Sequence, residues 1–353
     1  MDITKILTVA VERGASDIFI IAGLPVSFKV NGVIQYLDDE RLTPDQTADL
    51  ISGIYAYAHG RDIHQVTVDG DDDFSFALKG VSRFRVSTYK QRGSLAAVIR
   101  VITFELPNPQ DLGIPDSVLA LARRNKGLVL VTGPAGSGKS TTLACMIDQI
   151  NREEAAHIIT LEDPLEYLHS HKKSIVSQRE VNTDTTSFVT ALRAALRQSP
   201  DVILLGEMRD HETITIAMTA AETGHLILSS LHTVGAANTI DRVIDAFPPN
   251  QQHQISVQLA MVLQAVVSQQ LVPTVDGKIA PAFEIMTVTP AIRNMIRESK
   301  IHQIDSVIGT SADENMIAMD TSLERLCRSG VITAKTALEF ATNPDLLSKK
   351  LKL

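Results

Sequence analysis

GLVLVTGPAGSGKST, residues 127–141, is the stretch that decides the fold of this chain. It begins with an apolar run typical of a buried strand, and it ends where a segment of helical character begins. Between the two, residues 133–140 match the pattern GxxxxGK[ST] at every fixed position. A glycine-rich turn that joins a strand to a helix predicts a loop whose backbone N–H groups wrap around phosphate oxygens.

This loop carries the groups that a nucleotide needs. Lys139 brings a positive charge to the β- and γ-phosphates, and the Ser140 hydroxyl is a suitable Mg²⁺ ligand. The alternative is a glycine-rich loop before an ordinary helix, but the strand and helix on either side favour the nucleotide. We therefore predict that ATP, with Mg²⁺, is bound by nine consecutive residues: Gly133, Pro134, Ala135, Gly136, Ser137, Gly138, Lys139, Ser140 and Thr141.

Apolar strands alternate with helical segments after the loop. The strands read HIITLED (157–163), DVILLGE (201–207) and HLILSSLHT (225–233), and helical segments at 187–198 and 212–223 lie between them. Such alternation predicts a parallel sheet that is covered by helices on both faces. The tail from about residue 290 is expected to be mostly helical.

The first hundred residues predict a smaller α+β domain. Residues 3–13 have helical spacing, residues 26–37 form an expected hairpin with Asn31-Gly32 at its turn, and a helical stretch follows Pro44. Further strands are expected in 74–78, 83–89 and 95–102. Three prolines in LPNPQDLGIPDS (106–117) favour an extended connector. We therefore predict an N-terminal domain over 1–106, a linker over 107–115 and an ATPase domain over 116–353.

Acidic residues follow two of the expected parallel strands. Glu162 and Asp163, with Glu166 nearby, follow one strand, and Glu207 follows the other. Ligands gather at the carboxyl ends of parallel strands, so both groups are expected to face the phosphates. One would help to hold Mg²⁺ together with Ser140, and the other would orient or deprotonate the attacking water. The alternative, that acids at strand ends are simply solvated, fits one isolated acid better than two sets.

Two histidines lie at opposite ends of the strand in GHLILSSLHT. His232 lies at the carboxyl end, where a γ-phosphate would be sensed, and we predict that it contacts the phosphate. His225 lies at the other end, and a structural role is an equal alternative for it. His157, His169 and His171 are expected at the surface.

The segment RFRVSTYKQRGSLAAVIR predicts a hairpin that turns at Arg92-Gly93. A symmetric register places Arg85 opposite Arg100. Like charges facing each other across two strands are destabilising unless an anion lies near them. The pair is either two arginine fingers donated to bound nucleotide or a solvated basic strand face, and the residues alone leave both open.

Composition narrows the classes of protein. The chain has 353 residues and a net charge of −8, with 4% aromatic residues and no tryptophan. A nucleic-acid motor of related fold would need a basic channel with aromatic residues, so this class is disfavoured. The only cysteines are Cys145 and Cys327, which argues against a disulfide framework and a four-cysteine zinc site. We expect no signal peptide and no membrane-spanning segment.

These motifs together resemble the secretion and pilus ATPase superfamily. GPAGSGKSTT is similar to its Walker A motif, IITLEDPLEY to its Asp box, DVILLGEMRD to its Walker B motif and TGHLILSSLHT to its His box. The resemblance implies a RecA-like P-loop domain with a parallel-rich sheet, preceded by a smaller PAS-like α+β domain. In that family the smaller domain supplies arginines, and Arg85 in FRVST and Arg100 in VIRVI match those positions.

Within the superfamily, the chain most resembles the retraction ATPases of type IV pili. The segment AIRNMIRESK, residues 291–300, is similar to a C-terminal signature tied to retraction in that family; its spacing alone fits an ordinary packing helix. The resemblance implies a cytoplasmic homohexamer at the inner face of the cytoplasmic membrane. It also implies as partners an inner-membrane pilus platform protein, other pilus machinery and an auxiliary retraction ATPase, with no nucleic acid.

Other functions remain as alternatives. An extension or secretion ATPase of the same superfamily usually carries an extra N-terminal domain and a four-cysteine zinc element, and no CxxC occurs here. An auxiliary retraction ATPase is disfavoured by AIRNMIRESK. A nucleotide-binding scaffold without turnover is disfavoured by Glu207.

Overall fold

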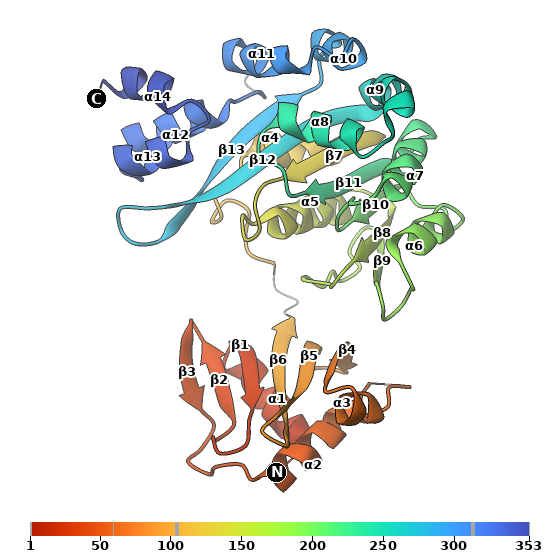
Figure 1. Cartoon of the computed structure of the whole chain (residues 1–353), viewed down its shortest axis with the longest axis vertical. Coiled ribbons are helices and arrows are strands. Elements are labelled where there is room, and N and C mark those ends of the chain that lie inside the picture. Colours follow the sequence, from red (N-terminus) through yellow and green to blue (C-terminus); the bar gives the residue numbers. More distant parts are fainter. Residues whose placement is uncertain (1, 59, 103–105, 312–314, 353) are drawn as a thin grey trace. The chain divides into compact units, whose positions relative to one another are not determined.

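The computed structural model describes residues 2–58, 60–102, 106–311 and 315–352. The chain divides into two compact units, one made of residues 1–105 with 166–168 and the other of the remainder (Figure 1). The boundary between the two units falls at 105–106. Residues 103–105, which belong to the expected first domain, lie outside the described residues. The exact domain limits and the linker over 107–115 therefore stay a prediction.

The first unit is a six-stranded antiparallel sheet with helices (Figure 1). Its strand order is β3-β2-β1-β6-β5-β4, and neighbouring strands run antiparallel throughout. Its elements are α1 (Ile3–Glu12), β1 (Ala15–Ile20), β2 (Ser27–Val30), β3 (Val33–Tyr36), α2 (Pro44–Tyr55), α3 (His64–Val68), β4 (Asp71–Leu78), β5 (Ser82–Gln91) and β6 (Ser94–Ile102).

Both turns expected in this unit are present. Asn31 and Gly32 have φ angles of 50° and 80°, and Arg92 and Gly93 have φ angles of 50° and 82°. Two successive residues with positive φ are what a two-residue hairpin turn requires. The first turn joins β2 to β3 and the second joins β5 to β6, so both hairpins predicted from the sequence are confirmed.

The second unit is built on a seven-stranded sheet in the order β13-β12-β7-β11-β10-β8-β9. All of its strand pairs are parallel except β12–β13, so the predicted parallel-rich sheet is confirmed. The elements up to the last of these strands are α4 (Asp116–Leu119), a 3₁₀ turn η1 (Ala120–Arg123), β7 (Gly127–Thr132), α5 (Lys139–Glu153), β8 (His157–Glu162), β9 (Ile175–Glu180), α6 (Phe188–Ala195), β10 (Val202–Leu205), α7 (His211–Glu222), β11 (Leu226–Leu231), α8 (Ala236–Asp245), α9 (Pro249–Val262), β12 (Leu263–Pro273) and β13 (Ile279–Thr287).

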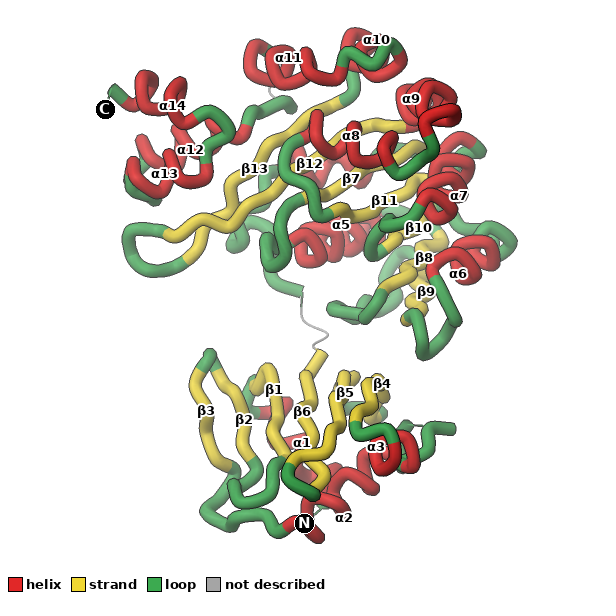
Figure 2. The backbone as a smooth tube through the Cα atoms, in the orientation of Figure 1, coloured by secondary structure: helices red, strands yellow, loops and turns green. Residues whose placement is uncertain are grey.

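Helices cover both faces of this sheet, as expected (Figure 2). On β7, Leu128 and Leu130 point into a core that includes residues of α6 to α9. The alternate residues Val129 and Val131 point into a second core with α4, η1 and α5. Successive side chains on a strand face opposite ways, which is why an unbroken apolar run such as GLVLVT forms a strand buried on both faces.

The C-terminal tail is helical, as expected. It contains α10 (Pro290–Arg297), a 3₁₀ turn η2 (Ile301–Gln303), α11 (Ile304–Thr310), α12 (Met319–Arg328), α13 (Ala334–Phe340) and α14 (Pro344–Leu351). Thr289 caps α10 by accepting a hydrogen bond from the backbone N–H of Ile292, and Pro290 occupies the first turn. Of the helices in the described part of the chain, none is both long and apolar enough to cross a membrane.

Candidate nucleotide site

The phosphate loop, residues 133–140, has the backbone that its glycines were expected to allow. Gly133, Gly136 and Gly138 all have positive φ angles, of 146°, 76° and 85°. At Gly133 a side chain is also sterically excluded, because a Cβ there would lie 2.1 Å from the backbone oxygen of Gln269. Gly138 is the N-cap of α5 and makes no side-chain cap hydrogen bond, so the N–H groups at the start of the helix follow directly on the loop. The loop therefore fits a bound phosphate, which such N–H groups attract.

Lys139 is buried, and its ammonium group is held at the mouth of the loop. Its Nζ atom donates to the carbonyl oxygens of Gly133 and Pro134 at 3.0 and 2.9 Å. The same atom lies 3.5 Å from Nδ1 of His232. The positive charge is thus fixed beside the backbone that would surround the phosphates.

Glu207 follows β10 and lies next to this lysine–histidine pair. Its side chain is only 15% exposed, and Oε2 is 2.7 Å from Nε of Arg209 and 3.4 Å from Nε2 of His232. An imidazole protonated at Nε2 satisfies both neighbours, because it donates to Glu207 and accepts from Lys139. The predicted loop, glutamate and histidine are therefore brought together at one edge of the sheet.

Glu162 and Asp163 lie at the same edge of the sheet. β8 pairs in parallel with β10, and the N–H of Gly206 donates to the carbonyl of Leu161 at 2.8 Å. A Cβ on Gly206 would lie 3.4 Å from Cα of Glu162, so the chain before Glu207 passes directly alongside Glu162. The half-buried Glu162 and the exposed Asp163 are thus available near the phosphate loop. Their predicted role as Mg²⁺ ligands, with Ser140, stays a prediction.

The other histidines have structural surroundings. His225 bonds through Nδ1 to the carbonyl of Ala220 at 2.9 Å, near the end of α7, which supports its structural alternative. His157 bonds to Ser177 and Gln198, and His171 accepts from the N–H of Val176. His169 is half-buried, with its Nδ1 atom enclosed, so the surface prediction holds only in part for it. Burial lowers the pKa of its imidazole to about 4.

The arginine hairpin has the predicted register, with Arg85 directly opposite Arg100. The surroundings differ from the expectation in one respect. Asp17 on β1 also faces Arg100, and its Oδ1 accepts from Nε of Arg100 at 3.2 Å. The Asp17 carboxylate offsets part of the repulsion between Arg85 and Arg100. A nearby nucleotide is therefore less necessary to explain why the two arginines face each other. The predicted finger role stays a prediction.

Comparison with known proteins places the chain in a family. Residues 1–325 match the family described as type II/IV secretion system protein. The chain belongs to this family.

Relatives of the chain within this family include pilus ATPases. The type IV pilus retraction ATPase PilT of Pseudomonas aeruginosa is 44% identical over 98% of this chain and 99% of its own length. A twitching motility protein of Neisseria gonorrhoeae is 44% identical over 91% of this chain and 85% of its own, and the type IV pilus ATPase PilU of P. aeruginosa is 40% identical over 100% and 92%.

A solved structure of the family has the same fold. The pilus retraction motor PilT with bound ADP matches at a TM-score of 0.90 and 46% identity, covering 99% of both chains. The predicted fold class, a P-loop α/β domain with a parallel-rich sheet after a smaller α+β domain, is thereby confirmed. The family also supports nucleotide binding by this chain.

Two contacts of the site were not predicted. Arg209, two residues after Glu207, pairs with its carboxylate, and the motif DVILLGEMRD contained this arginine without indicating the contact. Gln269 on β12 accepts a hydrogen bond from the Thr142 hydroxyl at 2.7 Å. No sequence signal marks Gln269, because it is far from the loop in sequence and lies on a strand that was not anticipated.

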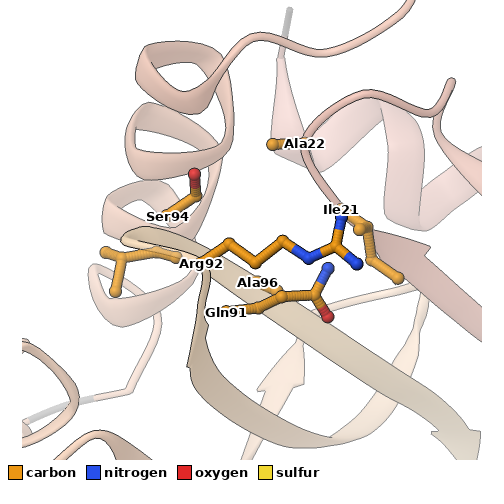
Figure 3. Close-up of a pocket in the computed structure, with 7 residues that line it drawn as sticks. Ile21, Ala22, Gln91, Arg92, Ser94 and Ala96 are labelled. Atoms are coloured by element: carbon orange, nitrogen blue, oxygen red, sulfur yellow. The ribbon is translucent and has the colours of Figure 1, made fainter.

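A separate cavity of about 110 Å³ lies in the first unit, at the β5–β6 turn (Figure 3). Figure 3 shows the side chain of Arg92 extending toward Ile21. The remaining lining residues are Ala22, Gln91, Ser94, Leu95 and Ala96. Five of the seven belong to the hairpin that carries Arg85 and Arg100, and none belongs to the phosphate loop. Among the described residues, no group of three or more His, Cys, Asp or Glu side chains is arranged so that it could hold a metal ion.

Proposed function

We propose that this chain is the hexameric ATPase motor that powers type IV pilus retraction and twitching motility. The observation that carries the proposal is the contact of Lys139 with His232 and of His232 with Glu207, beside a loop shaped for phosphate. Such a constellation would serve hydrolysis better than simple nucleotide storage, because a carboxylate would lie near the phosphate of a nucleotide bound in the loop. The relatives named for pilus retraction and twitching motility support the cellular role.

The residues around the phosphate loop have separate proposed roles in nucleotide binding and hydrolysis. Lys139 and the N–H groups at the start of α5 would bind phosphate oxygens, and Ser140 would hold Mg²⁺ with Glu162 and Asp163. When bound, Mg-ATP supplies the phosphoanhydride bond that is broken. Glu207 would orient the attacking water and accept its proton; because Arg209 already occupies Oε2, the accepting atom would be Oε1.

His232 and the two arginines of the first unit complete the proposed site. His232 would sense the γ-phosphate, because its ring lies between the ammonium of Lys139 and the carboxylate of Glu207. Arg85 and Arg100 would be donated to the nucleotide of the same subunit or of a neighbour in the ring. Arginine fingers act by stabilising the negative charge of the transition state.

The assembly and location are part of this proposal. A homohexamer would dock from the cytoplasm onto an inner-membrane pilus platform protein and reach the membrane only peripherally. The PilU relative supports a setting in which two related ATPases serve one pilus machine. Light scattering with an ATP analogue and Mg²⁺ tests the ring directly, and a strictly monomeric protein at micromolar concentration would contradict it.

We expect a deletion strain to accumulate surface pili that do not retract. The reason is that removal of a retraction motor leaves assembly intact, and surface piliation with a twitching assay measures the result. Complementation with the intact gene is the control. Bald cells would instead assign the chain to pilus extension, and unchanged pili and motility would contradict a role in either process.

A second expected result concerns α10, which we infer to be a coupling element outside the hydrolytic site. Ile292 and Ile296 are buried, whereas Arg297 is exposed and bonds to Asn294 of its own helix. Replacing Arg293 and Arg297 together with alanine should leave phosphate release near the wild-type rate and abolish retraction, because the apolar face of the helix is untouched. Lys335→Ala, at another exposed basic position, is the control. If retraction survives the double substitution, α10 is a packing helix only.

A further inference from the structure

β12 runs directly beneath the phosphate loop. It pairs in parallel with β7, and the register sets Ser268 opposite Thr132, the last residue of β7. The next residue, Gln269, is therefore level with Gly133, where the loop begins. A Cβ on Gly133 would lie 2.1 Å from the backbone oxygen of Gln269, so the loop rests directly on this strand.

The side chain of Gln269 is a buried polar group, only 3% exposed. Its Oε1 accepts the 2.7 Å hydrogen bond from the hydroxyl of the fully buried Thr142, in the first turn of α5. A Cβ on Gly138 would lie only 2.9 Å from Nε2 of Gln269. Backbone and side chain of one glutamine thus contact the phosphate loop at its beginning and at its end.

The neighbouring residue points to the opposite face of the sheet. Ser268 Oγ accepts from the N–H of Gly235 at 2.9 Å, in the loop that follows His232. Because successive side chains on a strand face opposite ways, the two contacts are made separately. A change at Gln269 should consequently disturb the phosphate loop while the segment after His232 keeps its anchor.

We propose that Gln269 is a positioning residue that holds the phosphate loop in its nucleotide-binding shape. The inference rests on the proposed nucleotide site and adds a residue that touches neither phosphate nor water. A buried acceptor or donor that loses its partner is costly, and loop and strand would relax to restore it. Loss of the Gln269–Thr142 bond therefore weakens nucleotide binding more than it slows turnover of bound nucleotide.

The test measures the Kd of a fluorescent ADP analogue for the full-length chain, with KM and kcat for ATP. Gln269→Ala is expected to raise Kd and KM roughly 10- to 100-fold, the range for a buried group left without its partner. The value of kcat should change much less. Gln270→Ala is the matched control, because the neighbouring Gln270 donates instead to the carbonyl of Phe340. This variant is expected to bind the ADP analogue with the wild-type Kd.

Thr142 offers an independent pair of variants should Gln269→Ala fail to fold. Thr142→Val removes the hydroxyl at nearly constant volume and should weaken binding, whereas Thr142→Ser keeps the hydroxyl and should restore it. Equal Kd values for the valine and serine variants would overturn the inference, as would unchanged binding in Gln269→Ala while the wild type binds. If the wild type itself binds no nucleotide, the proposed function fails as well. A role confined to stability would lower the melting temperature and leave Kd unchanged.

Discussion

Glu207→Gln is expected to bind ATP normally and to lose turnover by roughly 10²- to 10⁴-fold, the usual contribution of general-base catalysis. The amide keeps the size of the carboxylate and can still accept from Arg209 through its oxygen. It cannot take a proton from water at neutral pH. Lys139 and its contacts with the loop carbonyls are not touched, so nucleotide affinity should persist.

Steady-state phosphate release and equilibrium binding of an ATP analogue measure the two halves of this prediction. Glu212→Gln is a suitable control, because this nearby carboxylate is exposed and pairs with Arg193, outside the site. It should hydrolyse ATP at the wild-type rate. Near-normal turnover in Glu207→Gln would reassign the base to Glu162, Asp163 or Glu166.

Arg85→Ala and Arg100→Ala should each reduce turnover by roughly 10³- to 10⁵-fold, as removal of arginine fingers does elsewhere. Stability should hardly change. The side chain of Arg100 is 68% exposed, whereas that of its partner Asp17 is 12% exposed and also accepts a hydrogen bond from the Ser16 hydroxyl at 2.9 Å. Because Asp17 keeps this second partner, we expect loss of the ion pair to cost about 1 kcal/mol. Removing either arginine also relieves the repulsion between them, because they are opposite each other in the register.

The measurement is paired: ATPase rate and melting temperature on each single variant. Arg41→Ala provides a control, since this exposed arginine of the same unit donates a hydrogen bond to the carbonyl of Gly23, away from the arginine pair. Unchanged turnover in both test variants would make the pair a solvated basic strand face. A large drop in melting temperature would show a structural role instead.

Local signals allowed much of this molecule to be predicted. The strand, glycine loop and helix around Lys139 are contiguous, and the Arg92-Gly93 turn sets the register that brings Arg85 opposite Arg100. Contacts between distant segments were not accessible in the same way. Asp17 reaches Arg100 only because β1 pairs with β6, and β1 itself was not anticipated.

The second unit shows the same limit. The β12–β13 pair was not anticipated, in part because β12 follows α9 without any loop to mark the change of structure. Its buried Gln269 was therefore missed. His169 was assigned to the surface because it lies at no expected strand end near the phosphates, whereas packing encloses the Nδ1 atom of its half-buried ring. In each case the decisive neighbours come from elsewhere in the chain.

The β1–β6 pairing also has a consequence for how the chain is made. The first sheet consists of two halves, β3-β2-β1 and β6-β5-β4, in which every pair is adjacent in sequence, and only β1–β6 joins them. During synthesis the first half emerges with β1 as an open edge that has no partner until residues 94–102 follow. At ordinary translation rates the delay is roughly 4 to 15 seconds. Throughout that interval a nascent chain exposes the edge of β1, in addition to the edge strand β3 that stays open in the finished sheet, and the edge of β1 is able to pair with another copy.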